Sequence, residues 1–139
     1  MVKPSAEKHA ALVEFYTKAL APIGYSKLKS FPDGLTGFGQ TSPDWWVAID
    51  TKNTPSAFHV AFKAPGKAYS AIMSSKIPSN LTWENIDSAA VDAFYKASLE
   101  AGAKGNGPPG LRAAMDPKYY AAFILDPLGN NLEVGCMVN

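Results

Sequence analysis

The sequence of residues 119–134 is YYAAFILDPLGNNLEV, and it predicts two strands joined by a tight turn. Pro127 fixes φ near the value that the second position of a turn needs, and Gly129 or Asn130 can take the positive φ that closes the turn. The end of the chain is therefore predicted to be a β-hairpin.

The second strand of this hairpin carries one carboxylate, Glu133. Because successive side chains of a strand point to opposite faces, Glu133 shares its face with Asn131 and Gly135, and the apolar residues occupy the other face. A carboxylate in such a strand is either solvated or held by a partner. Glu133 is therefore the first candidate for a functional residue.

The composition of the 139 residues is that of an ordinary globular domain, with 47% hydrophobic and 18% charged residues. The 13 basic residues nearly balance the 12 acidic residues, and no basic run could follow a phosphate backbone. No apolar stretch approaches the roughly 20 residues of a membrane span. We therefore expect a soluble protein without a nucleic-acid or membrane partner.

The chain shows no sign of export. Its first residues, MVKPSAEK, contain no apolar signal core. Cys136 is the only cysteine, so an intrachain disulfide cannot form and a reducing compartment is suitable. A cytoplasmic location is the prediction.

Apolar spacing and turn residues predict the order of the elements. In the first half, a helix over 6–20 precedes strands at 25–31, 35–39 and 45–50. In the second half, a strand at 57–63 precedes a helix at 89–101 that begins after Asp87 or Ser88. A glycine- and proline-rich loop over 102–110 and strands at 111–114, 119–125 and 131–137 follow.

The two halves repeat one pattern. Phe15-Tyr16 precedes Leu20 at the interval at which Phe94-Tyr95 precedes Leu99, and a glycine follows each helix. Two copies of a βαβββ unit explain this order, since one unit alone leaves a sheet face unburied. We predict an α+β fold in a single domain over 1–139, with module one at 1–54 and module two at 55–139. The first strand of module one is truncated or missing.

Several motifs resemble the vicinal oxygen chelate superfamily, the fold of glyoxalase I, bleomycin-resistance proteins and extradiol dioxygenases. They are VEFYTKAL (13–20), PDWW (43–46), HVAF (59–62), VDAFY (91–95), NGPPGLR (106–112) and the ending YAAFILDPLGNNLE (120–133). The resemblance implies two modules that form a curled mixed sheet around a shared cleft.

The resemblance also implies a site in that cleft. His59 and Glu133 match family metal ligands, so a divalent ion (Zn, Ni, Mn or Fe) with Glu133 as catalytic residue would make the protein a lyase or dioxygenase. Arg112, Tyr119, Tyr120 and Trp46 are expected to bind a small oxygen-rich or aromatic substrate. The alternative is a metal-free, bleomycin-resistance-like protein that sequesters a small molecule.

Two further expectations concern the rest of the chain. Residues 66–88 form an apparent insertion relative to the family, which is interpreted as a lid, a disordered loop or an artefact of the gene model. A missing first strand would leave an exposed sheet edge, which tends to pair with another chain. We therefore expect a homodimer.

Overall fold

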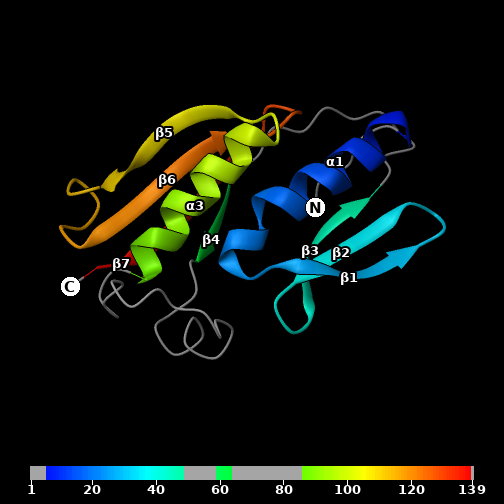
Figure 1. Ribbon diagram of the computed structural model, residues 1–139, viewed down its shortest axis with the longest axis horizontal. Helices are drawn as coiled ribbons and strands as arrows, with labels where there is room; N and C mark the ends of the chain where they lie inside the picture. Colours follow the sequence, from blue (N-terminus) through cyan, green and yellow to red (C-terminus); the bar gives the residue numbers. More distant parts are fainter. Residues whose placement is uncertain (1–5, 49–58, 64–85, 139) are drawn as a thin grey trace.

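The computed structural model describes residues 6–48, 59–63 and 86–138, and Figure 1 shows their arrangement. The elements follow in the order α1 (Ala6–Ala19), η1 (Ala21–Ile23), β1 (Ser26–Phe31), β2 (Leu35–Gly39), β3 (Pro43–Ala48), β4 (His59–Lys63), α3 (Ile86–Glu100), β5 (Lys104–Leu111), β6 (Tyr119–Leu125) and β7 (Asn131–Met137). No helix in these ranges is long and apolar enough to cross a membrane.

Helix α1 forms where the apolar spacing predicted it. It buries one stripe of side chains, including Leu12, Phe15, Tyr16 and Ala19. The short η1 turn follows, and Gly24 then takes a φ of 82°, which lets the chain turn away into β1.

Strands β1, β2 and β3 form an antiparallel sheet in the order β1-β2-β3, which we call sheet A. In the described part of the chain, which starts at Ala6, no strand precedes α1, and β3 pairs with β2 alone. The homodimer expected from an exposed sheet edge stays a prediction.

The other four strands form sheet B, in the order β4-β7-β6-β5. β4 runs parallel to β7, whereas β6 is antiparallel to both β7 and β5. The second half of the chain therefore has the predicted order of strand, helix and three strands. The α+β class is confirmed, and the closure of both sheets around one cleft stays a prediction.

Several predicted boundaries were wrong: β3 begins at Pro43 and not at residue 45, and the strand predicted at 111–114 does not continue past Leu111. β5 occupies Lys104–Leu111, where a loop was predicted, because β5 is an edge strand and an edge tolerates Pro108 and Pro109 without N–H donors. Its register shifts between Gly105 and Gly107 and again between Gly107 and Gly110. Helix α3 begins at Ile86, so the expected capping residues, Asp87 and Ser88, lie inside it.

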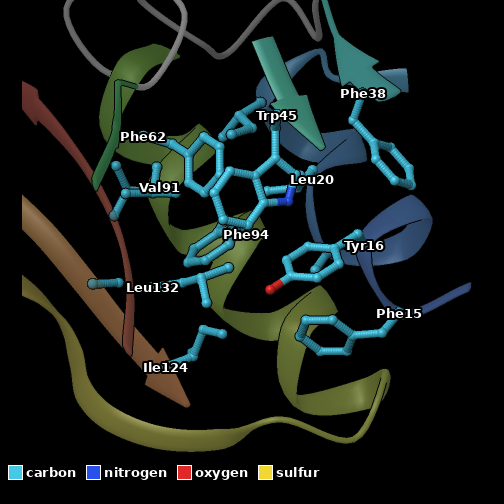
Figure 2. Close-up of a cluster of buried hydrophobic side chains, with 14 of the residues drawn as sticks. Phe15, Tyr16, Leu20, Phe38, Trp45, Phe62, Val91, Phe94, Ile124 and Leu132 are labelled. Carbon is cyan, nitrogen blue, oxygen red and sulfur yellow. The ribbon is translucent and has the colours of Figure 1, made fainter. Parts of the chain in front are cut away.

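The core joins the two halves of the chain (Figure 2). Helix α1 contacts α3, and α3 lies against β5, β6 and β7. Rings from α1, β3 and β4 meet there: the Tyr16 and Trp45 ring centroids are 5.6 Å apart, and those of Trp45 and Phe62 are 5.4 Å apart. Residues from both halves of the chain are therefore buried in one cluster. The single domain over 1–139 with two modules stays a prediction.

Most of the predicted insertion, 66–85, lies outside the described residues, as does the connection at 49–58 where the module boundary was predicted. The last residues of the insertion, 86–88, are the first residues of α3.

Candidate functional site

Sheet B has one face against α3 and one face turned away from it. The residues that face α3 include Ala122, Ile124, Leu132 and Val134, which are fully buried with Val91 and Phe94 of the helix. The strand register places the alternate residues together on the opposite face, which we call the outer face: Tyr119, Ala121, Phe123, Asn131, Glu133 and Gly135. The prediction that Glu133 shares a face with Asn131 and Gly135 is correct.

Glu133 is held by a tyrosine. The Tyr119 hydroxyl donates a hydrogen bond of 2.6 Å to Oε1 of Glu133, whose residue exposure is only 4%. Burial, together with the hydrogen bond to Glu133, raises the pKa of Tyr119 to about 12. The phenol therefore stays protonated at neutral pH and acts as a donor to this carboxylate.

Gly135 makes this contact possible. The Tyr119 ring lies directly across Gly135, and a Cβ at position 135 would come within 2.6 Å of Cε2 of that ring. Only a residue without a side chain allows the ring to cross β7 and reach Glu133. The sequence EVG at 133–135 thus encodes both the carboxylate and the space for its partner.

Arg112 lies over the same face. Its Nη2 donates to the carbonyl oxygens of Pro108 (2.6 Å) and Ala121 (3.2 Å), and its Cζ is 5.1 Å from the centre of the Phe123 ring. Phe123 is the Cα partner of Glu133 across the β6–β7 ladder. The structure therefore brings Arg112, Tyr119 and Glu133 to neighbouring positions on one surface.

Tyr120 points the other way. Its hydroxyl donates a hydrogen bond of 2.7 Å to Asp92 of α3. Burial, together with this hydrogen bond, raises the pKa of Tyr120 to about 12. Tyr120 thus ties β6 to α3, and the structure does not bring it together with Tyr119, Arg112 and Glu133.

Trp46 belongs to sheet A. Its ring lies over Gly37 and stacks on Phe31, with ring centroids 6.5 Å apart. Among the described residues, the Trp46 ring contacts Phe31 and Gly37 of sheet A, with Pro43 as its neighbour at Gly37.

His59 is placed by its backbone alone. It is the Cα partner of Asn131 in the parallel β4–β7 pair, and Ala61 is the partner of Glu133. His59 and Glu133 thus lie on adjacent strands, two residues apart in register. Within the described ranges, no group of three histidine, cysteine, aspartate or glutamate side chains could hold a metal ion.

The sequence analysis missed the role of Asp126. This buried carboxylate accepts hydrogen bonds from the backbone N–H groups of Leu128 (2.9 Å) and Asn130 (2.8 Å). It also accepts from the Asn130 amide (2.9 Å) and, across the core, from the Tyr16 hydroxyl of α1 (2.7 Å). An aspartate that opens a proline–glycine turn commonly bonds to the backbone two residues on, which was the available signal.

A second missed contact lies at the other end of the outer face. The Asn106 amide of β5 donates a hydrogen bond of 3.0 Å to Oδ1 of Asn131 on β7. This bond crosses β6, which lies between the two strands. Asn106 occupies the first register shift of β5, which the sequence pattern had placed in a loop.

No protein-family model matches the chain, and no curated protein matches it significantly. Solved structures do match. A glyoxalase/bleomycin resistance protein from Albidiferax ferrireducens T118 has a TM-score of 0.68 at 17% identity, over 96% of this chain and 94% of its own. A glyoxalase/bleomycin resistance protein/dioxygenase family enzyme from Burkholderia phytofirmans PsJN has a TM-score of 0.60 at 14% identity, over 99% and 94%.

A glyoxalase/bleomycin resistance protein/dioxygenase from Nocardioides has a TM-score of 0.52 at 18% identity, over 100% of this chain and 82% of its own. At such identities the likeness concerns the fold, and fold does not fix an activity. The chain has the fold of the glyoxalase/bleomycin resistance/dioxygenase structures, as its sequence motifs predicted.

Proposed function

We propose that this protein binds a small, oxygen-rich molecule on the outer face of sheet B, at Glu133. The observation that carries the proposal is the buried Glu133 carboxylate, held by the Tyr119 hydroxyl across Gly135. A buried carboxylate is costly unless it is hydrogen-bonded, so an arrangement that retains one on a sheet face is characteristic of a site.

The chemistry of the surface suits a ligand with hydroxyl groups. A carboxylate accepts hydrogen bonds only, and hydrogen bonds to a charged acceptor are roughly twice as strong as neutral ones. Tyr119 fixes the orientation of the Glu133 carboxylate, because the 2.6 Å bond holds Oε1. A ligand hydroxyl that donates to Glu133 would therefore meet a pre-oriented acceptor.

Catechol is a suitable first probe, since it presents two adjacent hydroxyl groups. Calorimetric titration should show catechol binding to the unmodified protein and at least a tenfold loss of affinity in Glu133→Gln. Asp92→Asn is the matched control, because Asp92 also accepts a hydrogen bond from a tyrosine but on the opposite face of sheet B. Equal affinities in all three proteins would refute the proposal.

A metal-dependent lyase or dioxygenase activity is the second candidate, and the β4–β7 register is the observation that favours it. His59 and Glu133 lie on adjacent strands, two register positions apart. A divalent ion would polarise the substrate oxygens when bound. The described residues alone do not complete such a centre, because catalytic sites usually take three protein ligands.

This candidate is tested by the metal content of the purified protein, compared with that of a His59→Ala, Glu133→Ala double variant. Near-stoichiometric zinc, nickel, manganese or iron that disappears in the variant would support the metal site and justify lyase and dioxygenase assays. No metal in either protein, even after incubation with these four ions, would leave a metal-free binding site.

A further inference from the structure

The guanidinium of Arg112 is held rigidly. Two hydrogen bonds from Nη2, to the carbonyl oxygens of Pro108 and Ala121, fix one end of the group, and the Phe123 ring supports it from below at 5.1 Å. These contacts have a structural cause. Pro108 and Pro109 cannot donate to β6, and the register shifts between Gly107 and Gly110, so Arg112 supplies a donor that the β5–β6 ladder lacks.

Among the described residues, no carboxylate forms an ion pair with Arg112; the ion pair found there joins Lys18 to Glu14 of helix α1. Arg112 is partly buried, and its side-chain hydrogen bonds within the described ranges run from Nη2 alone, while Nε is buried without a partner. The two N–H groups of Nη1 therefore remain as donors on a fixed cation.

Gly110, two residues before Arg112 in the chain, is not closely packed. Gly110 is the Cα partner of Ala121, whose carbonyl oxygen accepts from Arg112. A Cβ added to Gly110 would meet no atom within 4 Å, whereas a Cβ at Gly107 would come within 3.2 Å of Nη2 and 3.0 Å of the Phe123 ring. The close packing is thus confined to the Gly107 side, and the Gly110 side is open.

We propose that Arg112 anchors a carboxylate of the ligand through Nη1. This inference rests on the proposed binding site at Glu133 and names its substrate class: a small molecule that combines a carboxylate, for Arg112, with a hydroxyl donor, for Glu133. Because both donors of Nη2 are engaged by carbonyl oxygens, the carboxylate is bound through one nitrogen and not through the two-nitrogen fork that arginine often uses.

The alternative is that Arg112 only repairs the irregular β5–β6 ladder. The two roles differ in what they predict for a charged probe. A purely structural arginine would give no preference for an anion over a neutral molecule of the same shape. An anchoring arginine would favour the anion, and the preference would weaken with salt.

Benzoate and benzamide are matched probes, since they have the same shape and differ in charge. We expect benzoate to shift the backbone NMR resonances of residues 107–123 and to bind at least tenfold more tightly than benzamide, as measured by calorimetry. Gly110→Leu, which keeps Arg112 and fills the open space, should lower benzoate affinity at least fivefold. Glu133→Gln should raise it severalfold, because the variant removes a negative charge beside Phe123.

Arg112→Gln should abolish the preference for benzoate, and its NMR spectrum shows whether β5 stays paired with β6. If Arg112→Gln disrupts the pairing of β5 with β6, Gly110→Leu and Glu133→Gln still test whether Arg112 binds benzoate, because both variants keep Arg112. Equal binding of benzoate and benzamide, or benzoate affinity that none of the three variants changes, would overturn the assignment of Arg112. If catechol binding still depended on Glu133 in that case, the proposed binding site at Glu133 would stand without a role for Arg112.

Discussion

Replacing Tyr16 by phenylalanine tests whether the turn at 126–130 is locked to helix α1 by one hydrogen bond. The Tyr16 hydroxyl donates 2.7 Å to Oδ2 of Asp126, and both residues are buried. The variant keeps the ring contacts with Phe15, at 5.1 Å, and with Trp45, at 5.6 Å between centroids. The measured change therefore reports the lost hydroxyl rather than lost packing.

The expected cost is about 2 kcal/mol of the free energy of unfolding. A hydrogen bond to a charged group contributes roughly 1.5–3 kcal/mol, and losing it leaves a buried acceptor one donor short. Asp126 keeps three other donors, from Leu128 and Asn130, which places the expected value within the range and not above it. For a domain of this size the melting temperature should fall by roughly 5–8 °C.

Chemical denaturation monitored by circular dichroism gives this free energy. Tyr25→Phe is the control, because the Tyr25 hydroxyl donates 2.9 Å to Asp44, an exposed acceptor. We expect Tyr25→Phe to lower the free energy of unfolding by less than about 1 kcal/mol, because water replaces the lost donor to Asp44. A Tyr16→Phe variant no less stable than Tyr25→Phe would refute the argument that the buried bond locks the turn.

The same hydrogen bond predicts a response to alkali. Burial, with the charge of Asp126 as a further cause, raises the pKa of Tyr16 well above its ordinary value. A raised pKa gives stability that is fully present below the unfolded pKa, about 10, and is lost as the pH rises toward the folded pKa. Stability should therefore decline above about pH 10, and it should decline less steeply in Tyr16→Phe.

Two further outcomes are expected at the outer face. Gly135→Ala should destabilise the protein by roughly 1–3 kcal/mol, because the new Cβ overlaps the Tyr119 ring, and Tyr119→Ala in the same chain should recover most of the loss in denaturant unfolding. Burial is the main cause that raises the pKa of Tyr119 to about 12, and the Glu133 carboxylate adds to it, so Glu133→Gln should lower this pKa only in part in an ultraviolet titration, while the pKa of Tyr120 should stay near 12. Additive losses in the first experiment, or an unchanged Tyr119 titration in the second, would contradict the geometry at Gly135.

Local sequence signals predicted the regular elements of the fold well. The spacing of apolar residues placed α1, and alternation placed β2, β6 and β7 at the bounds that the structure has. The turn between β6 and β7 was also predicted, with Gly129 at a φ of 85°. These features depend on neighbouring residues, so the sequence displays them directly.

The prediction at β5 was wrong because this strand depends on a distant segment and not on neighbouring residues. Glycines and prolines at 105–110 indicate a loop by their local preference, and only pairing with β6 makes this segment a strand. Its position at the edge of sheet B removes the need for N–H donors on one side. An edge position is a property of the sheet and not of the segment, so local preference could not predict it.

The candidate site likewise has one feature that the local sequence predicted and one that only the tertiary structure decided. The sequence by itself determined that a carboxylate, Glu133, would share a strand face with a glycine, because alternation along a strand is fixed by backbone geometry. That Tyr119 rather than Tyr120 holds this carboxylate was decided by the tertiary structure, in which α3 covers one face of β6 and takes Tyr120 through Asp92. Which partner a residue meets depends on segments far away in the chain, and only folding brings those segments together.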